Sequence, residues 1–107
     1  TKVPKAPIMS KNQDLPLTAP VSENQVGRVI EEVEKRLGVP EAWRNGHQGW
    51  GWSSIVDVSI RDDYIHRGRK VIDFHWSGKS SHNFPETFRK VALEQGLPVG
   101  RLREISY

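Results

Sequence analysis

The sequence contains no cysteine and no long apolar run. Without cysteine there is no disulfide framework, and zinc-ribbon sites and thiol nucleophiles are excluded. No stretch approaches the roughly 20 apolar residues that a membrane-spanning helix needs, and the N-terminus lacks the hydrophobic region of a signal peptide. We therefore expect a soluble protein with no membrane partner.

Nucleotide-binding motifs are also missing. The segment Gly78-Lys79-Ser80 resembles the end of a P-loop, but the glycine required five residues earlier is replaced by Asp73. No Gly-x-Gly-x-x-Gly occurs, so a dinucleotide fold has no support. We expect no small-molecule cofactor.

The chain has 107 residues and a net charge of +3. That length suits one domain with a modest core. The first 60 residues carry equal numbers of acidic and basic side chains, whereas residues 61–107 carry nine Lys/Arg against six Asp/Glu. The basic second half predicts a polyanionic partner, and we expect RNA in preference to DNA. Thr1 in place of Met suggests a domain from a longer secreted or phage-borne protein that acts in the cytoplasm.

Residues 1–21 contain four prolines among small and polar residues. This composition disfavours a helix interior and predicts an extended arm or linker. Such an arm would tether an upstream domain, contact a partner or remain a flexible tail. Residues 22–107 are then expected to form a single α+β domain.

Two helices are marked by capping and stop signals. Ser22 and Gln25 fit a capping box, and apolar residues recur at helical spacing until Gly38 ends the helix. The charged remainder of that helix, including Glu34, is expected to be solvated. A second helix is expected after Asn83 as its cap, and it ends before Gly96.

Two runs have the alternation of strands, and their connection contains turn-forming residues. Residues 52–60 predict a half-buried strand, residues 62–69 a hairpin connection, and residues 70–76 a second strand. In the second strand Ile72, Phe74 and Trp76 would face the core, while Asp73 and His75 share the other face. With a short strand expected in residues 100–107, the fold class is α+β, with the helices on one sheet face.

Asp73 and His75 form a candidate acid/base pair. Cleavage of RNA without a metal needs a base for the ribose 2′-OH, an acid for the leaving oxygen and a cation for the phosphate. We assign His75 as the acid/base group and Asp73 as its orienting or basic partner, with His82 as a second acid/base candidate. Lys79 supplies a cation close to the reacting phosphate. Basic residues expected to hold nucleic acid are Arg61, Arg67, Arg69 and Lys70.

Several features have competing interpretations. Trp50, in a glycine-rich segment after His47, would stack on a nucleobase or cap the core. The four histidines match no compact metal-binding motif, so we expect no metal site. Asp73 and His75 are also explained as ordinary outward-facing residues of a sheet. In that case the domain would be a non-enzymatic module that binds a protein partner through its arm and its Trp-bearing loop.

Two nuclease resemblances accompany these residues. The order of helix, strands and a helix ending in Gln95-Gly96-Leu97 resembles the double-stranded-RNA-binding fold and HicA-type mRNA interferases over residues 26–97. Their Gly-Ser-His-His segment is absent, so no catalytic residue is transferred. Asp73-x-His75 followed by Lys79 resembles the Asp/His sites of rRNA-cleaving colicin and contact-dependent-inhibition nuclease domains. This resemblance implies an RNA-cleaving toxin domain, for which a protein inhibitor is a possible partner.

Overall fold

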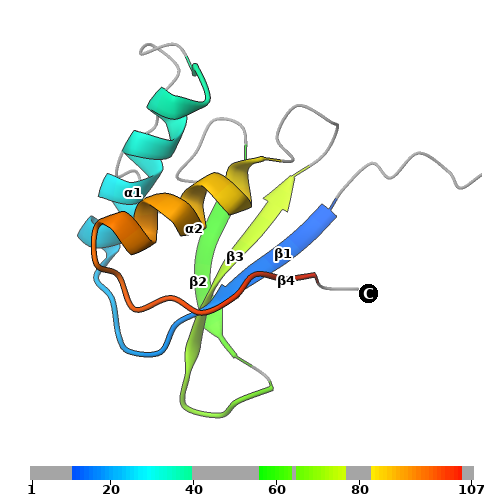
Figure 1. Ribbon diagram of the computed structural model, residues 1–107. Coiled ribbons are helices and arrows are strands. Elements are labelled where there is room, and N and C mark those ends of the chain that lie inside the picture. Colours follow the sequence, from blue (N-terminus) through cyan, green and yellow to red (C-terminus); the bar gives the residue numbers. More distant parts are fainter. Residues whose placement is uncertain (1–10, 40–55, 64, 77–82, 105–107) are drawn as a thin grey trace, which may run out of the picture.

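The computed structural model describes residues 11–39, 56–63, 65–76 and 83–104. These residues form an α+β fold of two helices and four strands (Figure 1). In chain order the elements are β1 (Lys11–Pro16), α1 (Glu23–Arg36), β2 (Asp57–Asp62), β3 (Lys70–Trp76), α2 (Phe84–Glu94) and β4 (Arg103–Glu104). No helix in these segments is long and apolar enough to cross a membrane.

Strand β1 lies inside the sheet, between β3 and β4. Sequence analysis placed its residues in an extended arm, and for this segment that expectation was wrong. Leu15 and Leu17, two residues apart and therefore on one face of the chain, are both buried in the core. Pro16 is tolerated because it is the last residue of the strand, and its carbonyl oxygen accepts a hydrogen bond from the Gly100 amide at 2.8 Å.

The strand order across the antiparallel sheet is β2-β3-β1-β4. Combined with the element order β-α-β-β-α-β, this is the split β-α-β topology of ferredoxin-like folds. The strand that precedes α1 and joins the sheet centre was missing from the helix-strands-helix order expected from sequence. Because such topologies host many unrelated activities, the topology alone assigns no function.

Helix α1 begins with the expected capping box. The Ser22 hydroxyl accepts a hydrogen bond from the Gln25 amide at 3.1 Å, and the Gln25 side chain accepts one from the Ser22 amide at 2.8 Å. One expectation for this helix was wrong, because Glu34 is fully buried instead of solvated. Glu34 follows the buried Ile30 by four residues and the buried Gly27 by seven, so helical geometry directs it towards the core.

Helix α2 closes the core over the middle of the sheet. Three rings pack together, with the Phe74 centroid 5.0 Å from that of Phe88 and 6.0 Å from that of Phe84, both edge to face. Asn83 occupies the N-cap position, but its side chain makes no capping hydrogen bond, contrary to expectation. Its backbone is helical (φ −87°, ψ −5°), whereas a capping side chain normally needs an extended backbone.

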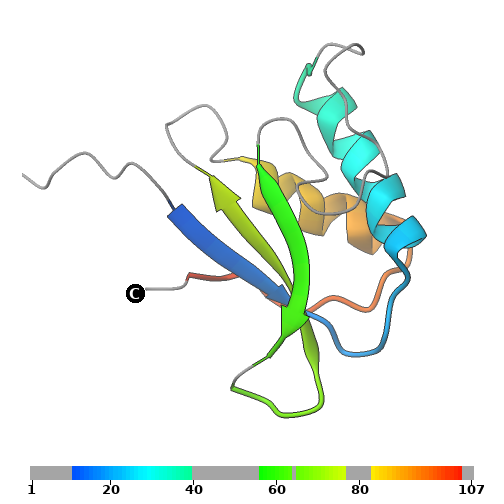
Figure 2. The same ribbon diagram turned by 180° about the vertical axis from the view of Figure 1, so that it is seen from behind.

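The strands β2 and β3 form the predicted hairpin, and β3 has the predicted bounds. Ile72, Phe74 and Trp76 are buried in the core. Both helices lie on this side of the sheet, so the view from behind in Figure 2 shows the strands in front of α2. Of the strand expected in residues 52–60, the structure describes residues 56–60. Residues 57–60 lie in β2, which continues to Asp62, two residues beyond the predicted end.

Candidate functional site

The sheet face opposite the helices carries two rows of polar residues. Strand pairing places Asp57, His75 and Asn12 in one row. The next row contains Ser59, Asp73, Asp14 and Arg103. Because directly opposed residues of antiparallel strands lie about 5 Å apart, all four strands contribute to one polar surface. We call these two rows, together with Arg61 and Asp63, which contact Asp73 and Arg103, the polar sheet face.

His75 is held by a residue of the neighbouring strand. Its Nδ1 lies 2.6 Å from Oδ1 of Asn12, directly opposite on β1. With the Asn12 amide oriented as in the structure, this oxygen can only accept, so Nδ1 carries the proton. The neutral imidazole then has a lone pair on Nε2, which is the arrangement that a general base requires.

Asp73 is bound from the other side, by β2. The Arg61 guanidinium donates to Oδ1 of Asp73 at 3.0 Å. Burial raises the pKa of Asp73 above its ordinary value, and the negative charge of Asp14 raises it further. The positive charge of Arg61 and its hydrogen bond to Asp73 oppose this rise without reversing it. Asp73 and His75 therefore have separate partners, and no hydrogen bond joins them in the described part of the chain.

Arg103 of β4 connects three parts of the molecule. Its guanidinium forms a two-point contact with Asp14 at 2.7 and 2.8 Å and reaches Asp63 at 3.4 Å. Burial acts to raise the pKa of Asp63, but backbone hydrogen bonds from Ile65 and His66 and the charge of Arg103 lower it below the ordinary value overall. The two carboxylates also raise the pKa of Arg103, so the guanidinium stays charged.

The polar sheet face is not itself basic. Among the described residues, the three buried carboxylates of Asp14, Asp63 and Asp73 pair with two guanidinium groups, those of Arg61 and Arg103. A group of exposed cations lies instead at the connection between β2 and β3, which projects beyond the other strands in Figure 1. This basic hairpin comprises Arg67, Arg69 and Lys70, all exposed.

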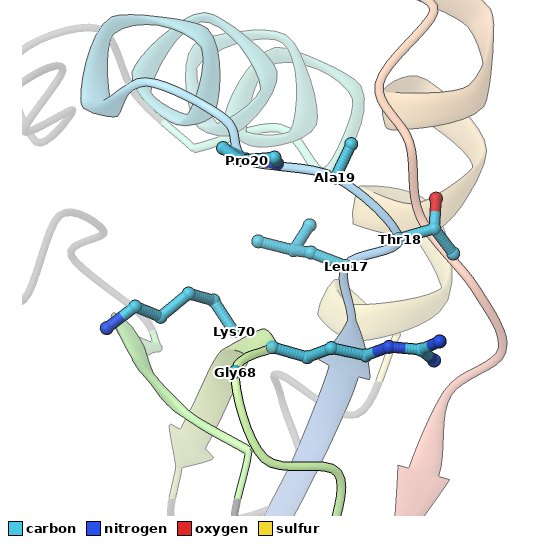
Figure 3. A pocket seen from close by; sticks show the side chains of 7 residues that line it. Leu17, Thr18, Ala19, Pro20, Gly68 and Lys70 are labelled. Atoms are coloured by element: carbon cyan, nitrogen blue, oxygen red, sulfur yellow. The ribbon is translucent and has the colours of Figure 1, made fainter.

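At the base of the basic hairpin there is a pocket of about 120 Å³. Residues 17–20, which join β1 to α1, line one side, and residues 68–70 line the other. Figure 3 shows the Leu17 side chain pointing into the space between Pro20 and Lys70. The Lys70 ammonium also pairs with the Asp62 carboxylate, which is an exposed interaction on the solvent side. The pocket thus combines an apolar wall with a cationic rim.

The predicted site residues are only partly brought together. Asp73, His75 and Arg61 lie on the polar sheet face, as expected, whereas Arg67, Arg69 and Lys70 lie on the basic hairpin. The remaining candidates, His82, Lys79 and Trp50, lie outside the described residues. Within the described ranges there is no group of histidine and acidic residues that could hold a metal ion.

Three residues of this surface were not predicted: Asn12, Asp14 and Arg103. Asn12 and Asp14 were assigned to the arm because of the prolines around them. Their alternation with Gln13 and Leu15 is typical of a strand but covers only four residues. That alternation was the available signal. Arg103 had no signal, because its partners lie 89 and 40 residues away in the sequence.

Comparisons with protein-family models, with curated proteins and with solved structures found no match to this chain. The functional argument therefore depends on the chemistry of its own residues.

Proposed function

We propose that this domain binds RNA and cleaves it without a metal ion, with His75 as the general base. The observation that carries the proposal is the 2.6 Å contact of His75 Nδ1 with Asn12. It fixes the imidazole on the polar sheet face and leaves Nε2 as a proton acceptor. Asn12 thus takes the orienting role that the sequence assigned to Asp73.

The reaction would proceed by attack of the ribose on its own phosphate. His75 Nε2 takes the proton of the 2′-OH, O2′ bonds to phosphorus, and the bond from phosphorus to O5′ breaks. Asp73 protonates O5′, a task favoured by the raised pKa of its buried carboxyl. Arg61, bonded to Asp73 at 3.0 Å, places positive charge beside the phosphate. The products are a 2′,3′-cyclic phosphate and a free 5′-OH.

Substrate binding would depend on the basic hairpin. In the part of the chain that the structure describes, the polar sheet face has more carboxylates than guanidinium groups, so we expect the exposed Arg67, Arg69 and Lys70 to contribute long-range attraction for phosphate. These exposed side chains would contact the phosphate backbone of the RNA, and such contacts do not depend on the base sequence. Binding should therefore weaken steeply as salt is added.

Cleavage of tRNA and rRNA in the presence of EDTA tests the proposal. We expect His75→Ala to reduce the cleavage rate by about a hundredfold or more, because the general base is lost. His66→Ala is the matched control, since His66 is exposed on the hairpin and outside the reacting group. Both variants should retain the far-UV circular dichroism of the natural protein.

Asn12→Ala tests the orienting contact separately. We expect a lower rate and an altered pH-rate profile, because the imidazole loses the acceptor that selects its tautomer. Asn24→Ala, at an exposed position of α1, controls for loss of an amide. Absence of cleavage of either RNA, or equal cleavage by the natural protein and His75→Ala, would refute the catalytic proposal.

A further inference from the structure

A second candidate binding site lies beside the sheet, away from His75. It is a cleft of about 410 Å³ between α2 and the chain that leads into β4. The described residues that line it are Glu86, Arg89, Arg101 and Leu102. We call it the α2 cleft.

Arg89 is held in place in this cleft. Its Nε donates to the Gly100 carbonyl oxygen at 2.7 Å, and the Gly100 amide in turn donates to the Pro16 carbonyl oxygen at 2.8 Å. The guanidinium is thereby fixed to the end of β1. No hydrogen bond from its terminal nitrogens is found among the described residues, so these donors remain available for a planar or tetrahedral oxyanion. A donor fixed before binding loses less conformational entropy when the ligand arrives.

The charge and surface of the α2 cleft favour one class of ligand. Arg89 and Arg101 contribute two positive charges and Glu86 one negative charge, which leaves a net charge of +1. No ion pair between Glu86 and either arginine is found in the described part of the chain. A net charge of +1 matches a singly charged phosphodiester better than a doubly charged phosphate monoester, and Leu102 offers apolar surface to a sugar.

The α2 cleft and the basic hairpin lie at the same end of the sheet. Leu17 forms a bridge with Val99, and its amide donates to the Lys70 carbonyl oxygen at 2.9 Å. Val99, two residues before Arg101 of the cleft, is therefore two strand spacings, roughly 10 Å, from Lys70 at the base of the hairpin. One nucleic-acid strand could contact both groups of cations.

We propose that the α2 cleft binds a backbone phosphodiester of the same RNA strand that the basic hairpin attracts. This inference rests on the RNA-binding part of the proposed function and does not require cleavage. Arg89 and Arg101 contact the phosphate oxygens in this proposal.

The test is binding of a labelled single-stranded 2′-O-methyl RNA, which lacks the nucleophile and cannot be cleaved. We expect Arg101→Gln to weaken binding about fivefold, as for an exposed ion pair. It should also reduce the slope of log affinity against log salt by about 0.7, the value for one phosphate contact on a single strand. Arg89→Gln should act in the same direction. Arg28→Gln, on the exposed face of α1, makes the same charge change outside the cleft.

Arg89→Gln also loses the hydrogen bond to the Gly100 carbonyl oxygen, so this variant could lose RNA binding because it unfolds. A second measurement therefore uses the natural protein. In NMR titrations of the natural protein, diethyl phosphate should shift the amide signals of Gly100, Arg101 and Leu102 more than inorganic phosphate does. A larger response to inorganic phosphate would contradict the assignment of a phosphodiester and indicate a site for a free phosphate ion.

The outcomes separate this inference from the proposed function. If Arg101→Gln and Arg28→Gln bind the oligonucleotide equally, or if the natural protein does not bind it, the inference is refuted. If the cleft variants weaken binding but His75→Ala leaves RNA cleavage unchanged, the cleft proposal stands and the catalytic proposal falls.

Discussion

At the residue scale, Asp14, Asp63 and Asp73 are carboxylates with at most 8% of their surface exposed. A buried carboxylate is tolerated when charged or hydrogen-bonded groups replace its lost water. Arg103 does this for Asp14 and Asp63, and Arg61 does it for Asp73. The guanidinium groups therefore stabilise the fold in addition to any role in phosphate binding.

Replacement of Arg103 by alanine should strongly destabilise the protein. The change leaves two buried carboxylates without their cation, and we expect a loss of about 3 kcal/mol in the free energy of unfolding. Urea denaturation measures this loss. Arg101→Ala, two residues away on an exposed site, should change stability by less than about 0.5 kcal/mol. A loss similar to that of the control would show that Arg103 contributes only as a surface charge.

Asp73 and Asp63 should titrate on opposite sides of the ordinary value of 3.8. Burial raises the pKa of Asp73, so its contribution to stability falls as pH rises from 3.8 through its folded-state pKa. The lowered pKa of Asp63 has the opposite effect, because its stabilisation is present above 3.8 and is lost as pH falls through its folded-state pKa. Carbon-detected NMR of the carboxyl groups measures both values. The reverse order would contradict the assigned environments.

At the element scale, the end of α1 shows why short sequence signals were sufficient to predict where a helix ends. Gly38 follows the helix with φ of +76°, a left-handed conformation that residues with a Cβ rarely adopt. This requirement belongs to the backbone alone, so it is visible in sequence. The capping box at Ser22 is local in the same sense, whereas the missing Asn83 cap depended on a backbone conformation that sequence did not reveal.

Gly38→Ala should cost about 1 kcal/mol of stability through backbone strain, since a Cβ there would meet no atom within 4 Å. Thermal or urea unfolding provides the measurement. Gly100→Ala is the comparison, because φ at Gly100 is not in the left-handed region and a Cβ would be 3.6 Å from the Pro16 carbonyl oxygen, an ordinary contact. Equal losses for the two variants would rule out strain at Gly38 as the cause.

Strand β1 is the element that the sequence did not predict, because its residues were assigned to an extended arm. Its proline content favoured an arm, yet Leu15 is fully buried and β1 pairs with both β3 and β4. Six residues are too few for alternation to outweigh four prolines in the surrounding segment. A polar face was predicted for β2 and β3, but its width across β1 and β4 depended on this unrecognised strand.

At the scale of the whole molecule, β1 determines whether the sheet is continuous. It lies between β3 and β4, and its last residue supports the Gly100 segment beside the α2 cleft. Both proposed binding regions therefore depend on an element near the start of the chain.

Deletion of residues 1–21 should unfold the domain instead of releasing a tether. The deletion removes β1, which lies inside the sheet between β3 and β4, together with the buried Leu15 and Leu17. We expect loss of the cooperative thermal transition and of dispersed NMR signals. Thr18→Ala, at an exposed position in the same segment, should leave both intact. A folded truncated protein would refute the structural role of β1.

Features that depend on neighbouring residues were predicted correctly from the sequence. These are both helices, the bounds of β3, the burial of Ile72, Phe74 and Trp76, and the placement of Asp73 and His75 on the opposite face. Period, capping and glycine conformation act over a few residues, so a single sequence is sufficient to reveal them.

The contacts between distant residues were visible only in the three-dimensional structure. The His75 contact with Asn12 spans 63 positions of the sequence, and the Arg103 contact with Asp14 spans 89. Such pairs follow from strand order and register, which depend on the packing of the whole sheet. The same packing gave Asp73 the partner Arg61 and left His75 oriented by an amide, so the pair recognised in sequence consists of two groups with separate partners.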